Sequence, residues 1–307
     1  MTLAISTSWN AYRFDNGKEL LFEISKLGFK AIELSFNLDP KMVAEIADSA
    51  KRLKISIVSL HNYCPIPDGL TRKQALPDCY SLASLDKEER FLALKYTRRT
   101  IDTASKLGAK VVVLHCGRVE VPDSTRQLIN LYNQGKNNAS EFLSLKEKMI
   151  QERKLNSERF LAQALNSINE LNNYAKLSGV FLGIETRFYY REIPNIEEIG
   201  VILDKFSNSQ VYYWHDTGHA QLMENLGLAR HKDFLEFYGR RLIGVHIHDL
   251  TGCQDHLAPL QGEIDFSILK PYLKQETLKV IEAHHPATAE ELIKSRNFIS
   301  QVYDEPI

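Results

Sequence analysis

The stretch VYYWHDTGHA, residues 211–220, decides how the rest of the chain is interpreted. A run of β-forming apolar residues leads into Asp216, and the turn-forming pair Thr217 and Gly218 follows before His219. This order is typical of a buried strand that delivers polar groups at its C-terminal end. The stretch therefore predicts that a carboxylate and an imidazole leave the end of one strand together.

Three further apolar runs end in the same way. VFLGIETR ends near Glu185, LIGVHIHD carries His246 and His248, and LKVIEAHH carries Glu282. Carboxylates and imidazoles from separate strand ends are suitable oxygen and nitrogen ligands for a divalent metal. The pattern therefore indicates metal chemistry at the place where these strands end.

For any one of these carboxylates alone, a salt bridge is an equally good interpretation, as between Glu185 and Arg187. The coincidence across strands favours the metal. Burial of Glu33 and Asp216 together with the other two carboxylates around one axis would be very costly without a cation, because like charges in a low-dielectric site cannot all stay ionised.

Strand and helix patterns alternate along the whole chain. Expected strands lie near residues 3–8, 30–36, 56–65, 110–117, 180–187, 211–216, 242–249 and 278–283, and a helical pattern follows each of them. Eight such units without an internal boundary predict one α/β domain over residues 1–307, a (β/α)8 TIM barrel. A doubly wound open sheet is the alternative, but the first strand–helix turn lacks G-x-G-x-x-G and polar residues end at least six strands rather than one switch point.

Residues 118–157 are polar and too long for an ordinary connection between a strand and its helix. We interpret them as an insertion after strand 4 that continues into a long helix closed by Gly179. The insertion leaves the barrel on the side where the strands end. It is either a solvated helical excursion or a lid over the mouth.

Composition narrows the classes of function. The 38 Lys and Arg residues against 39 Asp and Glu residues provide no global basic field for nucleic acid, although a local basic patch stays open. The four cysteines form no C-x-x-C pair, which disfavours a zinc knuckle or a disulfide framework. Without a signal-like start or an apolar run of roughly 20 residues, we expect a cytoplasmic protein with no membrane partner.

Several short motifs resemble one family when taken in order. LHNY, VVLHCG, GIETR, HDTGHA, VHIHD, DHLAPLQGEIDF and VIEA, placed at these strand ends, are similar to the xylose isomerase-like TIM-barrel superfamily. That superfamily contains sugar and sugar-phosphate isomerases and epimerases, inosose dehydratases and abasic-site nucleases of the endonuclease IV type. The resemblance covers nearly the whole chain and is weakest over residues 118–157.

Position by position, the resemblance implies that Glu185, Asp216, His246 and Glu282 bind the metal. It further implies a second set of residues that line the mouth and contact substrate: His61, His115, Arg187, His219 and His256. The histidines of this set match residues that bind additional ions in the nucleases.

One position departs from the nuclease pattern. The nucleases carry Asp two residues before the histidine that corresponds to His256, whereas this chain has Gln254 there and Asp255 beside it. A complete three-zinc cluster then requires a shifted loop. Among the remaining polar residues, strand alternation predicts His215 to be packed away from the mouth, and His231 is expected on an exposed helix face.

The resemblance implies an isomerase or epimerase that depends on a divalent ion, with Zn, Mn, Co and Mg all open. Its substrate would be a keto sugar, sugar phosphate or related polyol, and Glu185 and Glu282 would transfer a proton through an enediolate. One alternative is an endonuclease IV-like zinc phosphodiesterase, although a nucleic acid partner is disfavoured. Another is a barrel that binds a sugar without turnover. A homo-oligomer stays open.

Overall fold

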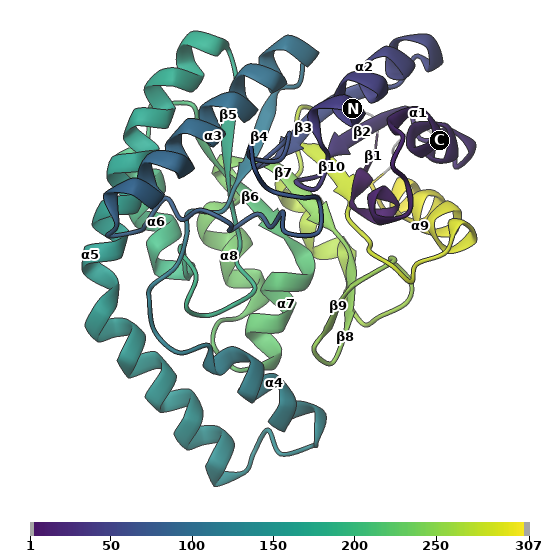
Figure 1. The fold of residues 1–307 in the computed structure, drawn as a ribbon. Helices are drawn as coiled ribbons and strands as arrows, with labels where there is room; N and C mark the ends of the chain where they lie inside the picture. The colour runs from purple at the N-terminus through teal and green to yellow at the C-terminus, as the bar shows by residue number, and fades with distance from the viewer. Residues whose placement is uncertain (1–2, 304–307) are drawn as a thin grey trace.

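The computed structural model describes residues 3–303 (Figure 1). Eight parallel strands close into a barrel in the order β1-β10-β7-β6-β5-β4-β3-β2, so the predicted TIM barrel is confirmed and the open sheet is wrong. The barrel strands are β1 (Ala4–Ser6), β2 (Ala31–Leu34), β3 (Ser56–His61), β4 (Val111–Leu114), β5 (Phe181–Glu185), β6 (Val211–Asp216), β7 (Leu242–Ile247) and β10 (Leu278–Ile281).

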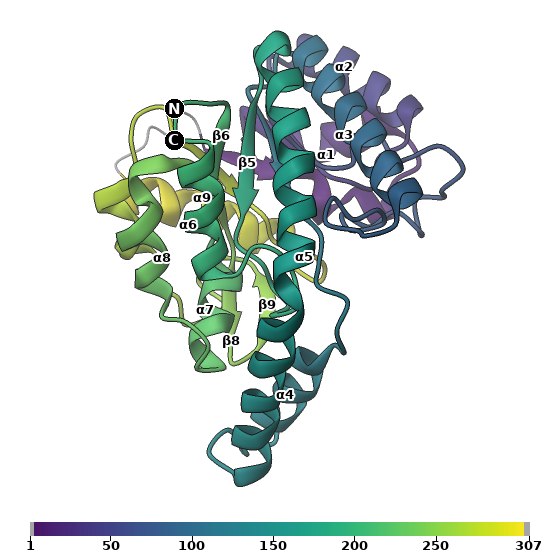
Figure 2. The ribbon, with the colours of Figure 1, turned by 90° about the vertical axis from the view of Figure 1, so that its left-hand side faces the viewer.

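Helices surround this barrel (Figures 1 and 2). They are α1 (Gly17–Lys26), α2 (Pro40–Leu53), α3 (Lys87–Leu107), α4 (Ser124–Asn133), α5 (Ser140–Ser178), α6 (Ile196–Lys205), α7 (Thr217–Asn225), α8 (His231–Tyr238) and α9 (Ala289–Val302). Short 3-10 turns lie at Thr7–Trp9, Ala11–Arg13, Gly239–Arg241 and Phe266–Tyr272. Helix ends follow the sequence signals: the Asp39 side chain caps α2 by accepting the Met42 N–H, and Gly179 ends α5 with φ +67°.

Two expectations near β6 are corrected. Thr217 and Gly218 begin α7 and do not form a turn, because the Asp216 side chain caps the helix by accepting the His219 N–H. The helical pattern that follows the expected strand at residues 211–216 is not one continuous helix through residue 238 but two helices, α7 and α8, and Gly227 lies between them with φ +67°.

The barrel interior places an apolar floor beneath the polar strand ends. Inward positions along the strands form a small buried cluster of Ala4, Ala31, Val111, Val113, Trp214, Leu278 and Val280. The Trp214 ring occupies space left by Gly183 and Gly244, since a Cβ at Gly244 would lie 2.1 Å from that ring. Two residues further along the same strands, alternation brings Glu33, Asp216 and His246 to the layer above the floor.

The insertion is helical and projects from the barrel (Figure 2). It consists of α4 and the first half of α5, which starts at Ser140 and not near residue 157 as expected. At 1.5 Å per residue, the 39 residues of α5 span about 58 Å. Its buried Arg153 donates from Nη1 to Glu198 Oε1 at 2.9 Å and from Nη2 to Glu198 Oε2 at 2.6 Å, which fixes α5 to α6.

An antiparallel hairpin, not expected from the sequence, follows β7. It pairs β8 (Asp249–Thr251) with β9 (Gln254–Leu257). The Asp249 carboxylate accepts backbone N–H groups of Leu260, Gly262 and Ile264 at 2.9–3.0 Å, so it holds the loop after the hairpin in place.

Among residues 3–303, no helix is both long and apolar enough to span a bilayer.

Candidate metal centre

Four predicted metal ligands meet around one imidazole nitrogen. His246 Nδ1 lies 2.6 Å from Glu185 Oε1, 2.9 Å from Glu282 Oε2 and 3.7 Å from Asp216 Oδ2. All four side chains are buried. Strands β5, β6, β7 and β10 therefore bring ligand-type atoms of three carboxylates and one imidazole to within 4.8 Å of one another. We call these four residues the carboxylate centre.

The donor set fits a divalent cation. Within the described part of the chain, the buried Asp216 Oδ2 finds no hydrogen-bond partner, which is unusual for a carboxylate oxygen. On the other side of the ring, His246 Nε2 lies 3.0 Å from Glu33 Oε1. A proton kept on Nε2 by this contact would make Nδ1 available to an ion. A carboxylate that fixes the far nitrogen of a ligating histidine is the usual support of a protein metal site.

The electrostatics of the centre favour a cation. Burial would lower the pKa of His246, but the charges of Glu282 and Glu33 hold that pKa well above its usual range. Burial would likewise raise the pKa of Glu282, yet the neighbouring His246 lowers it to about 2. The carboxylates are thus held ionised in a buried site, where a divalent ion would compensate their charge.

His61 and His115 lie near Oε2 of Glu185, whereas His246 contacts Oε1. His115 Nε2 is 2.7 Å from Glu185 Oε2, and His61 Nε2 is 3.7 Å from the same oxygen. Asp78 accepts from His115 Nδ1 at 3.1 Å. Burial lowers the pKa of His115, but Asp78 and Glu185 outweigh it and raise that pKa to about 9. Asp78 was not predicted, because it lies in an irregular loop without periodicity.

Arg187 is surrounded by carboxylates. It donates to Glu185 Oε2 at 2.7 Å and to Glu192 Oε1 at 3.2 Å, and its Nη2 lies 3.6 Å from Asp78 Oδ2. Glu192 was also missed by sequence reasoning, since it follows no strand. The contacts make Arg187 a support for Glu185, and its expected contact with substrate stays a prediction.

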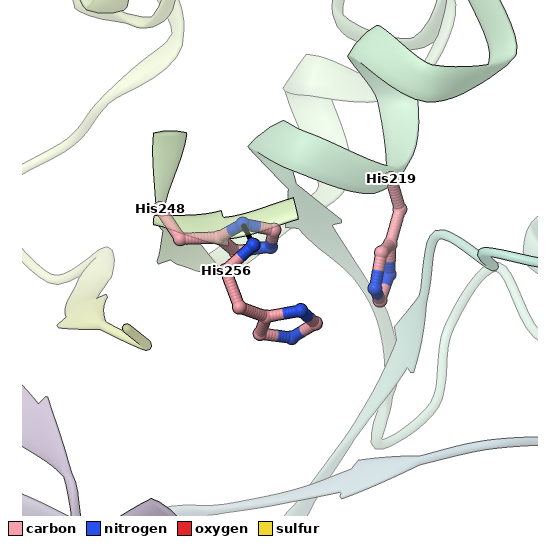
Figure 3. A group of neighbouring side chains, drawn as sticks. All are labelled: His219, His248 and His256. Carbon is pink, nitrogen blue, oxygen red and sulfur yellow. Dashed lines mark hydrogen bonds between the residues drawn. The ribbon is translucent and has the colours of Figure 1, made fainter. Parts of the chain in front are cut away.

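A second set of ligand-type residues, which we call the histidine group, contains His219, His248 and His256 (Figure 3). The rings of His248 and His256 stack with centroids 4.1 Å apart. Asp255 Oδ2 lies 2.7 Å from His256 Nδ1 and 4.0 Å from His219 Nε2, whereas Gln254 is exposed. The loop therefore places Asp255, one residue later than the nuclease pattern, beside these histidines.

Two histidines lie outside the mouth. His215 is packed as expected, with Nδ1 2.7 Å from the Tyr213 hydroxyl and Nε2 3.0 Å from His231 Nε2. The expectation that His231 is exposed is wrong, because its side chain is buried at the start of α8 between His215 and Gln221.

A cavity of about 360 Å³ opens above the centre. Its walls combine polar and aromatic groups: Phe36, His61, Leu76, Pro77, Asp78, His115, Arg126, Glu185, Arg187, Phe188, Tyr189, Glu192, His219, Asp255, His256, Glu282 and His284. Every residue predicted to contact substrate lines it, and Arg126 reaches it from α4. A larger groove of about 550 Å³ lies between α2 and α3, outside the barrel and away from these groups.

The fold and the site define a (β/α)8 barrel with a carboxylate and histidine centre at the C-terminal ends of its strands, the position of active sites in this fold. Residues 21–300 match the family described as xylose isomerase-like TIM barrel. The chain belongs to that family.

Comparison with known proteins gives distant relatives. An uncharacterized protein, y4fM of Sinorhizobium fredii, is 26% identical over 59% of this chain, and the match spans 48% of its own length. A D-tagatose 3-epimerase-like protein has a similar structure, with TM-score 0.69, 20% identity and coverage of 99% of this chain and 97% of that one. The IolI protein with a bound zinc atom gives TM-score 0.67, 17% identity and coverage of 99% and 98%.

Proposed function

We propose that this protein is a divalent-metal-dependent isomerase or epimerase of an uncharged keto sugar or related polyol. The observation that carries the proposal is the carboxylate centre, in which the buried Asp216 Oδ2 has no hydrogen-bond partner among the described residues and faces His246 Nδ1. The similar fold of an epimerase-like protein and of a zinc-binding protein supports it.

Glu185, Asp216, His246 and Glu282 would hold the ion. When bound, a divalent cation supplies positive charge that lowers the pKa of a C–H bond next to a sugar carbonyl.

Glu185 and Glu282 would move the proton. Glu185 is the last residue of β5 and Glu282 directly follows β10, and these two strands are separated in the barrel by β6 and β7. The two carboxylates can therefore approach a substrate carbon from different sides, one removing the proton and the other returning it. His115 and Arg187 both donate to Glu185 Oε2, and these contacts keep that carboxylate ionised and oriented.

The charges around the cavity favour an uncharged substrate. Its walls hold five carboxylates and two arginines, and the raised pKa values of His115 and His256 make these two imidazoles further cations. Arg187 already contacts three carboxylates, and Arg126 at the rim donates to the Tyr189 hydroxyl at 3.0 Å and lies 3.1 Å from Asp123. Neither arginine is therefore free to pair with a phosphate, and the described residues that line the cavity include no lysine. Hydroxyl groups suit these acceptors better.

Proton exchange at carbon tests this function. We expect the metal-loaded protein in D2O to incorporate deuterium next to the carbonyl of at least one neutral ketose, and ketose phosphates to exchange much more slowly. Glu185→Gln and Glu282→Gln should each reduce the exchange by about 10²–10⁴-fold, the span of a positioned general base. Mass spectrometry of the recovered sugar measures it.

Metal content must be equal in the compared samples, because both glutamates are also proposed ligands. Glu276→Gln, at an exposed position before β10, is the matched control and should exchange like the wild type. Full exchange in both active-site variants would remove the two glutamates from the mechanism. Cleavage of abasic DNA without exchange of any sugar would replace the proposal with the nuclease alternative.

A further inference from the structure

His248 is a ligand-type residue whose two ring nitrogens are both hydrogen-bonded within the protein. It lies two residues after His246, and its ring is fully buried. Its Nδ1 accepts the His256 backbone N–H at 2.9 Å, a contact drawn in Figure 3. A backbone N–H can only donate, so the ring proton is on Nε2, which donates to Asp216 Oδ1 at 2.8 Å. Both nitrogens are therefore engaged.

Thr217 and Gly218, which follow β6, pack closely against His248. The Thr217 hydroxyl donates to the His248 carbonyl at 2.7 Å and accepts the His248 N–H at 3.1 Å. At Gly218 a Cβ would lie 2.0 Å from His248 Cε1, so a larger residue would displace the imidazole. The sequence Asp-Thr-Gly thus contacts His248 through a carboxylate, a hydroxyl and a bare Cα in turn.

These contacts determine how Asp216 is oriented. Its Oδ1 accepts from His248 Nε2 and from the His219 N–H at 2.7 Å. Its Oδ2 has no partner among the described residues and points toward His246 Nδ1, 3.7 Å away. Rotation of the carboxylate would break two buried hydrogen bonds. These bonds therefore fix Oδ1 and keep Oδ2 directed toward the carboxylate centre.

We propose that His248 is a positioning residue that fixes Asp216 for metal binding and links it to the β8–β9 hairpin through His256. The inference rests on the metal centre of the proposed function. It assigns His248 no contact with the ion. Movement of the hairpin would be transmitted to Asp216 through a single imidazole.

Two substitutions separate the two hydrogen bonds. In His248→Asn the amide oxygen can take the place of Nδ1 and accept the His256 N–H, but the side chain is too short to reach Asp216. In His248→Gln the amide nitrogen can take the place of Nε2 and donate to Asp216, while the acceptor for His256 is lost. The two variants therefore test orientation of Asp216 and attachment of the hairpin independently.

The measurement is Zn²⁺ affinity of the metal-free protein, by competition with a chelating dye. We expect His248→Asn to weaken Zn²⁺ binding by about 10–100-fold, the usual effect of removing a residue that supports a ligand. His248→Gln should stay closer to the wild type. Hydrogen exchange at the His256 amide should show the opposite order, fast in His248→Gln and slow in His248→Asn.

The outcomes are distinguishable. Wild-type affinity in both variants would overturn the positioning role. Equal loss of affinity in both, with an equal drop in the melting temperature of the metal-free proteins, would show that the ring acts by packing alone. Failure of the wild type to bind Zn²⁺ would reject the metal centre itself and with it the inference, whereas a loss confined to His248→Asn supports both.

Discussion

The carboxylate centre and the histidine group lie side by side in one barrel mouth, and both have ligand-type atoms within 4.8 Å of one another. The two clusters differ in which of their ligand-type atoms are already hydrogen-bonded to the protein. In the carboxylate centre, the buried Asp216 Oδ2 is without a hydrogen bond from any described residue. In the histidine group, both nitrogens of His248 are hydrogen-bonded. The contrast lies between Asp216, which keeps one buried oxygen without a hydrogen bond, and His248, whose two nitrogens both have partners.

Stacking gives the histidine group a different role. The His256 ring lies between His248, at a centroid distance of 4.1 Å, and His284, at 3.8 Å. His284 also donates its backbone N–H to the His256 carbonyl at 2.9 Å. The three rings form a wall from the end of β7 to the loop after β10. Two of these rings, His256 and His284, line the cavity in which a substrate would be held.

The largest loss of metal binding and activity is expected from a substitution in the carboxylate centre. Asp216→Ala removes the unpaired oxygen and one negative charge, so metal binding should weaken by more than the roughly 100-fold upper value for a supporting residue, and proton exchange should disappear with it. Metal analysis after dialysis and the exchange assay measure the two losses. Asp48→Ala, at an exposed position of α2, is the control. A fully loaded Asp216→Ala protein would end the assignment.

The histidine group should respond more weakly. His256→Ala removes a stacked ring but no proposed ligand, so we expect about one ion per chain in both the variant and the wild type, with a raised KM for the sugar. Elemental analysis of the saturated proteins compares the stoichiometry. A wild type that holds two ions and a variant that holds one would make the histidine group a second metal site, like the carboxylate centre.

The smallest effect is expected at the rim. The Arg126 side chain is 69% exposed and contacts the Tyr189 hydroxyl. In Arg126→Ala the KM should rise only a few-fold with kcat unchanged, because truncation of an exposed contact costs about 1 kcal/mol or less. Steady-state kinetics at equal metal content test this. A large fall in kcat would place Arg126 in the chemistry.

Strand ends were the most predictable part of the molecule. A buried parallel strand has a compact apolar pattern, and alternation fixes which of its residues face inward. Glu185, Asp216, His246 and Glu282 could therefore be placed in one layer before any contact was known. The resemblance to a family added their roles, which neither spacing nor the structure tests.

The rest could not be predicted because it depends on contacts between segments far apart in the sequence. Asp78 meets His115 from an irregular loop, and no local pattern marks it. His231 has the sequence environment of an exposed helix residue, but His215 covers it in the fold. The first half of α5 has the polar composition of a loop, yet it is helical, and its buried Arg153 pairs with Glu198, which lies far along the chain.

The long helix α5 has a mechanical consequence. It runs from the projecting insertion to the barrel wall without a glycine or proline, the residues at which helices most often bend. The bidentate contact of Arg153 with Glu198 clamps it part of the way along. α5 is thus a beam fixed to the barrel, and α4 is mounted near its free end. α5 therefore carries α4 beside the barrel mouth, and the helix itself contains no glycine or proline at which it could bend toward that mouth.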